Sequence, residues 1–334
     1  MVLKFKPTYR VTADGSDISG LLGSRLISIE VTDRTGVESD SCTITLADPG
    51  PFKIALPRTG AVLEVSLGYA PFAESMGRYI VDEVSLSGPP DQVVITARAS
   101  PHDATNDGLT ELQTQKTRSF EDGTTIGELV EQLAGEHGLQ AAIAEDLAEI
   151  EPPHVDQLNE SDISLLTRIA ANYGAVVKPA GGRLAVVKRG AGQSVSGTAL
   201  PTVVLTPGDV SQWSATLARR ETAKKVVAVW HDFDAAEDKE AKSGDGDPVR
   251  RLRHSFPDEN SAQQAADSER ERSEREGNKV SVTLPGRTDL MAEGRLVLVG
   301  FREGVSGEWT IEGVTHKLDQ GGYSCTVDAE QGGD

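Results

Sequence analysis

Short runs with apolar residues at alternate positions fill the first hundred residues of the chain. Gly, Pro and Asp residues separate the runs at intervals of about ten positions, and the runs are 25–33, 41–48, 61–69, 78–88 and 91–99. Alternation is the pattern of a strand with one buried face, and turn residues at this spacing are typical of an antiparallel sandwich or barrel. The pattern predicts a first antiparallel β-barrel domain over residues 1–105.

The spacing of apolar residues then changes from two to the helical period. Residues 124–138 predict a helix with Ile126, Leu129, Val130 and Leu133 on its apolar face. Thr125 and Glu128 have the spacing of a capping box, in which each side chain binds the other residue's backbone N–H. Gly138 stands where a helix ends in the left-handed conformation.

A second amphipathic helix is predicted within residues 159–175. Ser161 is the expected N-cap and Gly174 the expected stop, and the apolar stripe consists of Ile163, Leu166, Ile169, Ala170 and Tyr173. Residues 175–190 then form two strand-like runs around a Gly-Gly turn. We expect a small α+β module over residues 106–195.

Strand-like runs return after about residue 200 and are interrupted by one long predicted helix, residues 258–276, between Pro257 and Gly277. Its apolar positions are mostly alanines, Ala262, Ala265 and Ala266. Such a thin stripe suits a helix that lies flat on a sheet with its Glu and Arg side chains in water. The charged, Gly-containing stretch before it is expected to be a solvated loop. The prediction is a second β-barrel domain over 196–334 that carries a long surface helix.

The last third of the chain repeats the order of strand-like blocks of the first third. The matched blocks are 43–50 with 281–286, 65–69 with 297–301, 79–84 with 309–314, and 93–99 with 324–330. Two unrelated β domains with common strand chemistry would share some of these features. The agreement in order and spacing favours a duplicated fold, with the smaller module between the two copies.

Composition narrows the class of protein. The 334 residues carry a formal net charge of −19, which disfavours binding to nucleic-acid phosphates. No apolar stretch approaches the roughly 18 residues of a membrane span, and the first residues lack the apolar core of a secretory signal. Cys42 and Cys325 lie in separate strand-like runs, so we expect two buried thiols rather than a disulfide or a zinc site.

Candidate catalytic residues are few. The sequence contains no G-x-S-x-G, no G-x-x-x-x-G-K-[ST] and no H-E-x-x-H motif. Residues 154–162 gather four groups that offer an acid/base pair on paper, namely His154, Asp156, Glu160 and Asp162. His231 and the two aspartates of the segment 231–234 allow a metal-binding interpretation. Helix capping, surface solvation and an exposed strand end explain both groups more simply, so we predict no catalytic, cofactor-binding or metal-binding residues.

Several segments resemble one known family. Residues 157–175, "QLNESDISLLTRIAANYGA", resemble the Q-x-x-E-S-D-x-x-x-L-x-R-[LI]-A-x-x-x-G-A segment of the bacteriophage late control protein D family. Residues 79–99 are similar to that family's V-D-E-V-x-x-S-G-P-P-D stretch, 125–139 to its T-I-G helix, and 307–330 to its closing G-x-W-x-I-x-x-V-x-H segment. These are the hub proteins of contractile tails, related to the N-terminal part of type VI secretion spike proteins.

The resemblance implies a structural baseplate hub that needs no cofactor. It implies a homotrimer in which two tail-tube-like barrels per chain form a pseudo-six-fold ring between the six-fold tail tube and a three-fold spike. Implied partners are the tail tube, the trimeric spike as a separate chain, and baseplate and tape-measure proteins. DNA or cargo would pass through the lumen without specific binding, and the protein would assemble in the bacterial cytoplasm and reside in the virion tail baseplate.

Other functions remain open at this level. The same hub serves headless phage-tail-like particles, such as tailocins and contractile injection systems. A hydrolase of cell wall or polysaccharide would use the carboxylates near 154–162, and a β-sandwich adhesin would bind glycans as a monomer. Residues 69–78, 301–309 and 234–250 are candidate loops for contacts with the tube, the baseplate or a neighbouring copy.

Overall fold

The computed structural model describes residues 6–36, 40–99, 112–152, 154–180, 182–190, 192, 199–217, 223–232, 235–256 and 258–331. The predicted fold class is confirmed, because most elements are strands and nearly all of their pairings are antiparallel. Pro257, which we expected to start the long helix, lies outside the described residues.

The first part of the chain is a set of mainly antiparallel strands, here called the first β unit. Its elements are β1 (Pro7–Ala13), β2 (Ser16–Asp17), α1 (Ser19–Leu22), η1 (Gly23–Arg25), β3 (Leu26–Arg34), β4 (Ser41–Ala47), β5 (Val62–Tyr69), β6 (Phe72–Ser87) and β7 (Gln92–Ala99). The long strands pair in the order β3-β4-β7-β6-β5-β1. Alternate side chains of β4 are buried, as the sequence pattern predicts.

The middle of the chain forms the small α+β module. Its elements are β8 (Gln115–Ser119), α3 (Ile126–Glu136), β9 (Gln140–Ile143), α4 (Glu145–Ala148), β10 (Asp156–Ser161), α5 (Asp162–Asn172), β11 (Ala175–Ala180) and β12 (Arg183–Lys188). Both predicted caps are confirmed: Thr125 and Glu128 form the capping box of α3, and the Ser161 hydroxyl accepts from the Ser164 backbone N–H. Gly138 and Gly174 follow the two helices with φ of 66° and 63°.

The second β unit consists of strands from the last third of the chain. They are β13 (Thr202–Leu205), β14 (Gln212–Leu217), β18 (Asn278–Pro285), β19 (Arg295–Leu298), β20 (Gly307–Asp319) and β21 (Gly322–Gln331). Their pairing order is β14-β18-β21-β20-β19-β13. Element by element, this order equals that of the first unit, with β14 in the place of β3 and β20 in the place of β6. The direction of one strand differs, because β13 pairs with β19 in parallel whereas β1 pairs with β5 antiparallel.

A shared irregularity supports the duplication. The β6–β7 pairing skips one residue at Asp82, and the β20–β21 pairing skips one residue at Glu312. The two bulges align residues 79–84 with 309–314, as the sequence predicted. Bulges bend a strand and increase its local twist, so both hairpins bend at the same place.

Two of the other predicted matches are displaced by one residue. Leu63 pairs with Tyr79 and Leu296 with Trp309, so Val65 corresponds to Leu298 instead of Val297. The match of 93–99 with 324–330 shifts in the same way. Both runs end in a Gly-aromatic pair, but β5 includes its pair whereas β19 ends before its own. A shift of one residue exchanges the two faces of a strand.

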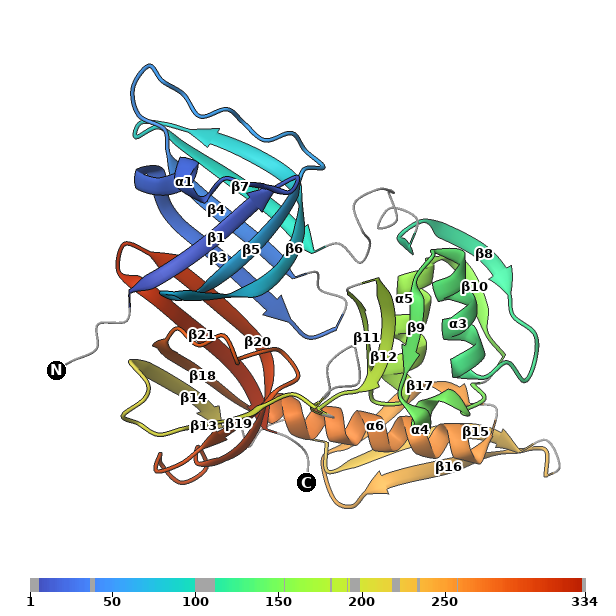
Figure 1. Ribbon diagram of the computed structural model, residues 1–334. Helices are drawn as coiled ribbons and strands as arrows, with labels where there is room; N and C mark the ends of the chain where they lie inside the picture. The colour runs from blue at the N-terminus through green and yellow to red at the C-terminus, as the bar shows by residue number, and fades with distance from the viewer. Residues whose placement is uncertain are drawn as a thin grey trace.

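The two β units are joined edge to edge. Residues 313–319 of β20 pair antiparallel with residues 28–34 of β3, here called the internal junction, and both units enter one 13-stranded sheet. Figure 1 shows β3 and β20 side by side where the two units meet. The buried side chains of both units form one hydrophobic cluster. Among the described strands, no pairing closes either unit into a barrel.

A separate layer precedes the last strands. It consists of β15 (Lys225–Asp232), β16 (Glu237–Gly244), β17 (Val249–Phe256) and α6 (Glu259–Gly277). The helix lies along this three-stranded sheet and buries Ala262, Ala265 and Ala266, as predicted (Figure 1). The loop predicted before the helix is wrong over much of its length, because 237–244 and 249–256 are strands that pair with β15. Their charged side chains hid the strand pattern.

Half-buried ion pairs fix the module to both β units. The Lys178 ammonium lies 2.8 Å from Asp33 Oδ1 and 3.4 Å from Asp40 Oδ2, and the other Asp33 oxygen accepts from the Ala292 backbone N–H at 2.8 Å. Asp33 therefore connects strand β3, the module and the second unit. Burial lowers the pKa of Lys178, but the neighbouring carboxylates outweigh it and the net shift is upward.

Candidate functional site

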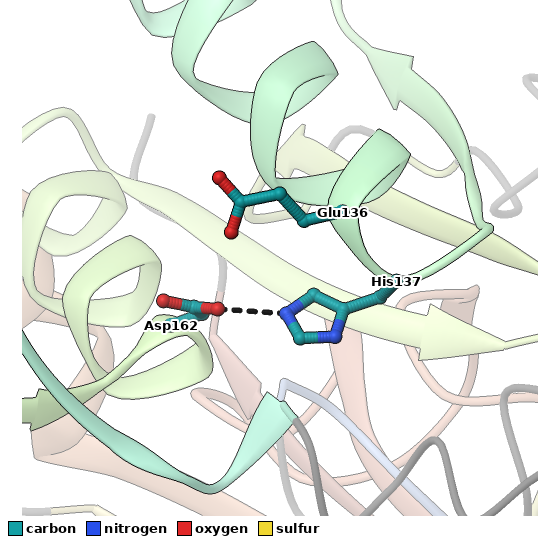
Figure 2. Close-up of side chains that lie close together, drawn as sticks. All are labelled: Glu136, His137 and Asp162. Atoms are coloured by element: carbon teal, nitrogen blue, oxygen red, sulfur yellow. Dashed lines mark hydrogen bonds and ion pairs between the residues drawn. The ribbon is translucent and has the colours of Figure 1, made fainter.

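Asp162, the first residue of α5, is the centre of a buried polar cluster. Its side chain is fully buried and accepts four hydrogen bonds, from Lys116 Nζ at 2.7 Å, Arg118 Nη2 at 2.8 Å, Gln157 Nε2 at 2.8 Å and His137 Nε2 at 2.7 Å. Figure 2 shows the contact between His137 and the carboxylate. Burial raises the pKa of Asp162, but the donors outweigh it and lower the pKa to about 2.

Glu136, at the end of α3, completes the charge balance of the cluster. Its two oxygens lie 2.7 and 2.9 Å from Arg118 Nη1, and one of them lies 3.3 Å from Lys116 Nζ. Burial raises the pKa of Glu136 as well, but the hydrogen bond from Arg118 and the other donors outweigh it, and the net shift is downward. Two carboxylates thus share two cations, and the cluster ties β8, β10, α3 and α5 together.

Three residues of this cluster, Glu136, His137 and Asp162, also form the group in the described part of the chain whose ligand atoms approach a metal-binding geometry. Oxygens of Glu136 and Asp162 and a ring nitrogen of His137 lie within 4.8 Å of one another (Figure 2). However, Lys116 and Arg118 already contact both carboxylates. A divalent cation bound there would face two fixed positive charges. The donor set fits a structural ion-pair network better than a metal centre.

The four residues that offered an acid/base pair on paper are divided among different contacts. His154 lies 2.5 Å from Asp122 and 3.2 Å from Asp156 on the surface, and its pKa is raised mainly by the hydrogen bond to Asp122. Glu160 forms an ion pair with Arg168. Asp162 alone joins the buried cluster. The four groups therefore do not converge on one point.

The alternative metal group around His231 lies at a strand end, as expected. His231 Nδ1 is 2.7 Å from Asp238 Oδ1, and Asp232 accepts from Lys239. Asp234 lies outside the described residues.

Sequence reasoning missed most members of the Asp162 cluster. Lys116 and Arg118 are two residues apart on β8, so both side chains leave the same face of the strand. That spacing was the available signal, but nothing in the sequence showed that this face would meet the start of α5.

Both cysteines are free and buried, as predicted. Burial raises the pKa of Cys42 to about 12 and that of Cys325 to about 11. Cys325 Sγ lies 3.1 Å from His316 Nδ1, which is also 2.9 Å from the Tyr323 hydroxyl. Thiols with raised pKa values are poor nucleophiles, so this cluster contributes to core packing.

The predicted contact loops are mostly strand. Residues 69–78 belong to the β5–β6 hairpin apart from a two-residue turn, and its tip exposes Phe72. Residues 307–309 open β20, and Trp309 is buried there. The loop prediction holds for the turn 302–306. In the described segments, every helix is too short or too polar to span a lipid bilayer.

Comparison with known proteins gives the family. The family described as phage tail baseplate hub (GPD) matches residues 65–322, which include strands of both β units and the whole module. The chain belongs to this family. A relative, the probable baseplate hub protein of Escherichia phage P2, is 31% identical over 367 residues, which cover 97% of this chain and 93% of that protein. A structural role in the tail baseplate follows for the hub chain.

Solved structures share the fold of this baseplate hub family member at low sequence identity. The 43 kDa tail protein of prophage MuSo2 from Shewanella oneidensis has a TM-score of 0.72 at 15% identity and covers 97% of this chain and 98% of its own. The Escherichia coli c3393 protein, a type VI secretion component described as similar to T4 tail proteins gp27 and gp5, has a TM-score of 0.55 at 13% identity. It matches 93% of this chain and 74% of its own.

Proposed function

We propose that this baseplate hub protein forms a homotrimeric, pseudo-six-fold ring between the tail tube and the central spike of a contractile tail. The observation that carries the proposal is the duplication within the chain. Two β units with the same strand order and the same bulge lie edge to edge through the internal junction. Three such chains supply six similar units, so one face of the ring is matched to a six-fold tube and the other keeps three-fold symmetry.

The remaining parts of the chain have structural roles in this proposal. In this proposal the segments 1–105 and 196–334 are the two domains that form the ring, and the segment 106–195 is the module beside the ring. The Asp162 cluster stabilises the module and performs no catalysis, because its carboxylates are occupied by Lys116 and Arg118. Tube, baseplate and tape-measure proteins are the other partners that we propose, with assembly in the bacterial cytoplasm.

The mass of the purified protein in solution tests the trimer. Light scattering after size-exclusion chromatography would be measured on the chain alone and on the chain co-expressed with the spike protein of the same tail. We expect three copies, if necessary only in the presence of the spike. A monomer, dimer or hexamer under both conditions would contradict the proposed ring.

A further inference from the structure

The internal junction shows how one β unit of this chain accepts the next. One edge of β20 is paired with β21 along its length, and the other edge carries β19 over 307–310 and β3 over 313–319. Within the junction, Val31 lies opposite His316 and Ile29 opposite Leu318. These side chains are 0–6% exposed. The junction therefore combines a backbone ladder with a closed apolar face.

In the described part of the chain, no strand covers the corresponding edge of the first unit. Strand β6 takes the place of β20, and it carries β5 over residues 72–80, as β20 carries β19. Val81 still exchanges backbone hydrogen bonds with Gly60 and Ala61, and from Asp82 onward the described residues of β6 pair with β7 alone. Leu86 on this stretch corresponds to His316, yet it is 63% exposed whereas His316 is 3% exposed. Unpaired strand edges with exposed apolar side chains are sites for pairing with another chain.

At the β14 end of the sheet, the complementary edge likewise carries no strand among those that the structure describes. Strand β14 takes the place of β3, and among the described strands it pairs with β18 only. It exposes 38% of Trp213 and 47% of Leu217. Trp213 corresponds to Ile29, which is completely buried in the internal junction. Each chain thus offers one donor strand, β14, and one acceptor edge, on β6. These are equivalent to β3 and β20, which pair inside the chain.

We infer that β14 of one copy pairs with β6 of the next copy in the ring and reproduces the internal junction between chains. The inference rests on the proposed trimer and specifies how its copies meet. Transfer of the β3–β20 register through the equivalent strands fixes four antiparallel pairs, which are Val84 with Leu217, Ser85 with Thr216, Leu86 with Ala215, and Ser87 with Ser214. The contact is heterologous, so it closes only when the last copy meets the first.

The shapes of the two edges agree with this register. Beyond Ser87, Trp213 of the neighbouring copy falls opposite Gly88, where the internal junction has Ile29 opposite Leu318. The large Trp213 side chain thus lies opposite a glycine, which leaves room for it. An open hollow of about 570 Å³ lies at this point, with Leu86, Gly88 and Pro89 among its lining residues. Pro89 has no N–H to donate, so the ladder would end there.

A pair of cysteines tests the register in the trimer isolated for the mass measurement. The variant carries Ser85→Cys and Thr216→Cys, and the matched control carries Thr32→Cys and Thr315→Cys, the equivalent pair of the internal junction. Cys42 and Cys325 are buried and leave the background low. Mild oxidation is expected to link the control within one chain. It is expected to link the variant between chains, in products of two and three copies and no more. The linked fraction should be similar to that of the control.

A further cysteine variant tests the register, and two charge variants test the contact without cysteines. Ser85→Cys with Ser214→Cys is two positions out of register, and diagonal neighbours lie about 7–8 Å apart, so at least tenfold less interchain product is expected. Ser85→Lys with Thr216→Lys should shift trimer dissociation to a severalfold higher protein concentration, and Ser85→Glu with Thr216→Lys should reverse that shift, because like charges directly opposite each other destabilise a sheet.

The outcomes separate the two proposals. A trimer of confirmed mass that gives no interchain product and no charge effect would overturn the β14–β6 contact and leave the ring intact. Equal linkage in the out-of-register variant would overturn the register. Ladders that extend beyond three copies would overturn closure. Absence of any trimer, with or without the spike, would overturn the ring and this contact together.

Discussion

Replacement of Asp162 by Asn is the most direct test of the polar cluster in the module. The pKa of Asp162 falls from 3.8 to about 2 in the folded protein. At about 1.36 kcal/mol per pKa unit, this shift corresponds to roughly 2.5 kcal/mol of stability above pH 4. The amide also places an N–H group toward Lys116 and His137, which are donors in the native cluster. We expect the variant to lose about 3 kcal/mol.

Hydrogen exchange measured by mass spectrometry locates this loss. A loss of about 3 kcal/mol speeds exchange through module unfolding by roughly 10²-fold, and the effect should appear in peptides from β8 and α5. The control is Asp156→Asn, whose side chain is 45% exposed and whose replacement should change exchange far less, because water screens exposed ion pairs. Because the lowered pKa contributes stability above pH 3.8 that disappears as the pH falls toward 2, the difference from wild type should shrink at pH 3.

Two results would refute this reasoning. Exchange in β8 and α5 within threefold of wild type at pH 7 would mean that the cluster contributes little to stability. A change of equal size in the control would mean that the effect is unspecific.

Three further predictions concern the ion pairs that link the module to the β units and the packing inside the second β unit. Burial and the charge of Asp33 raise the pKa of Asp40 from 3.8 to about 6, so the folded state keeps the Asp40 proton between these pH values. The free energy of unfolding should therefore fall by about 3 kcal/mol as the pH rises from 3.8 to 6. Urea unfolding at several pH values should show that Asp40→Asn removes this dependence. Lys178→Met leaves both carboxylates without their cation and should cost about 3 kcal/mol, measured as faster exchange in β11. In Gly286→Ala, the new Cβ would lie 2.1 Å from the Tyr323 ring, which should cost about 1–3 kcal/mol in a thermal melt followed by tryptophan fluorescence.

Local features of the fold were predictable from the sequence because they depend on neighbouring residues. The capping box of Thr125 and Glu128 requires residues three positions apart, and the alternation of β4 requires only its own side chains. The order of blocks that revealed the duplication survives because both units bury the same faces. The charged strands β16 and β17 were missed because the apolar alternation there is weak.

Long-range features were not predictable in the same way. Asp162 looked like one of four acidic or basic groups near residue 160, and its partners Lys116 and Arg118 come from a strand more than forty residues earlier. The internal junction joins β3 to a strand almost three hundred residues later. The register of that pairing depends on which edges remain open after each unit has folded, and a single sequence does not encode this in any local pattern.

The pairing of β3 with β20 has a consequence for how the proposed ring would grow. A ring of six independent subunits must immobilise five bodies relative to the first, whereas three tandem chains immobilise two. Each immobilisation costs several kcal/mol in translational and rotational freedom. Half of the joints are closed as soon as one polypeptide has folded, at any concentration, so few partial rings would accumulate when the protein is scarce in the cell.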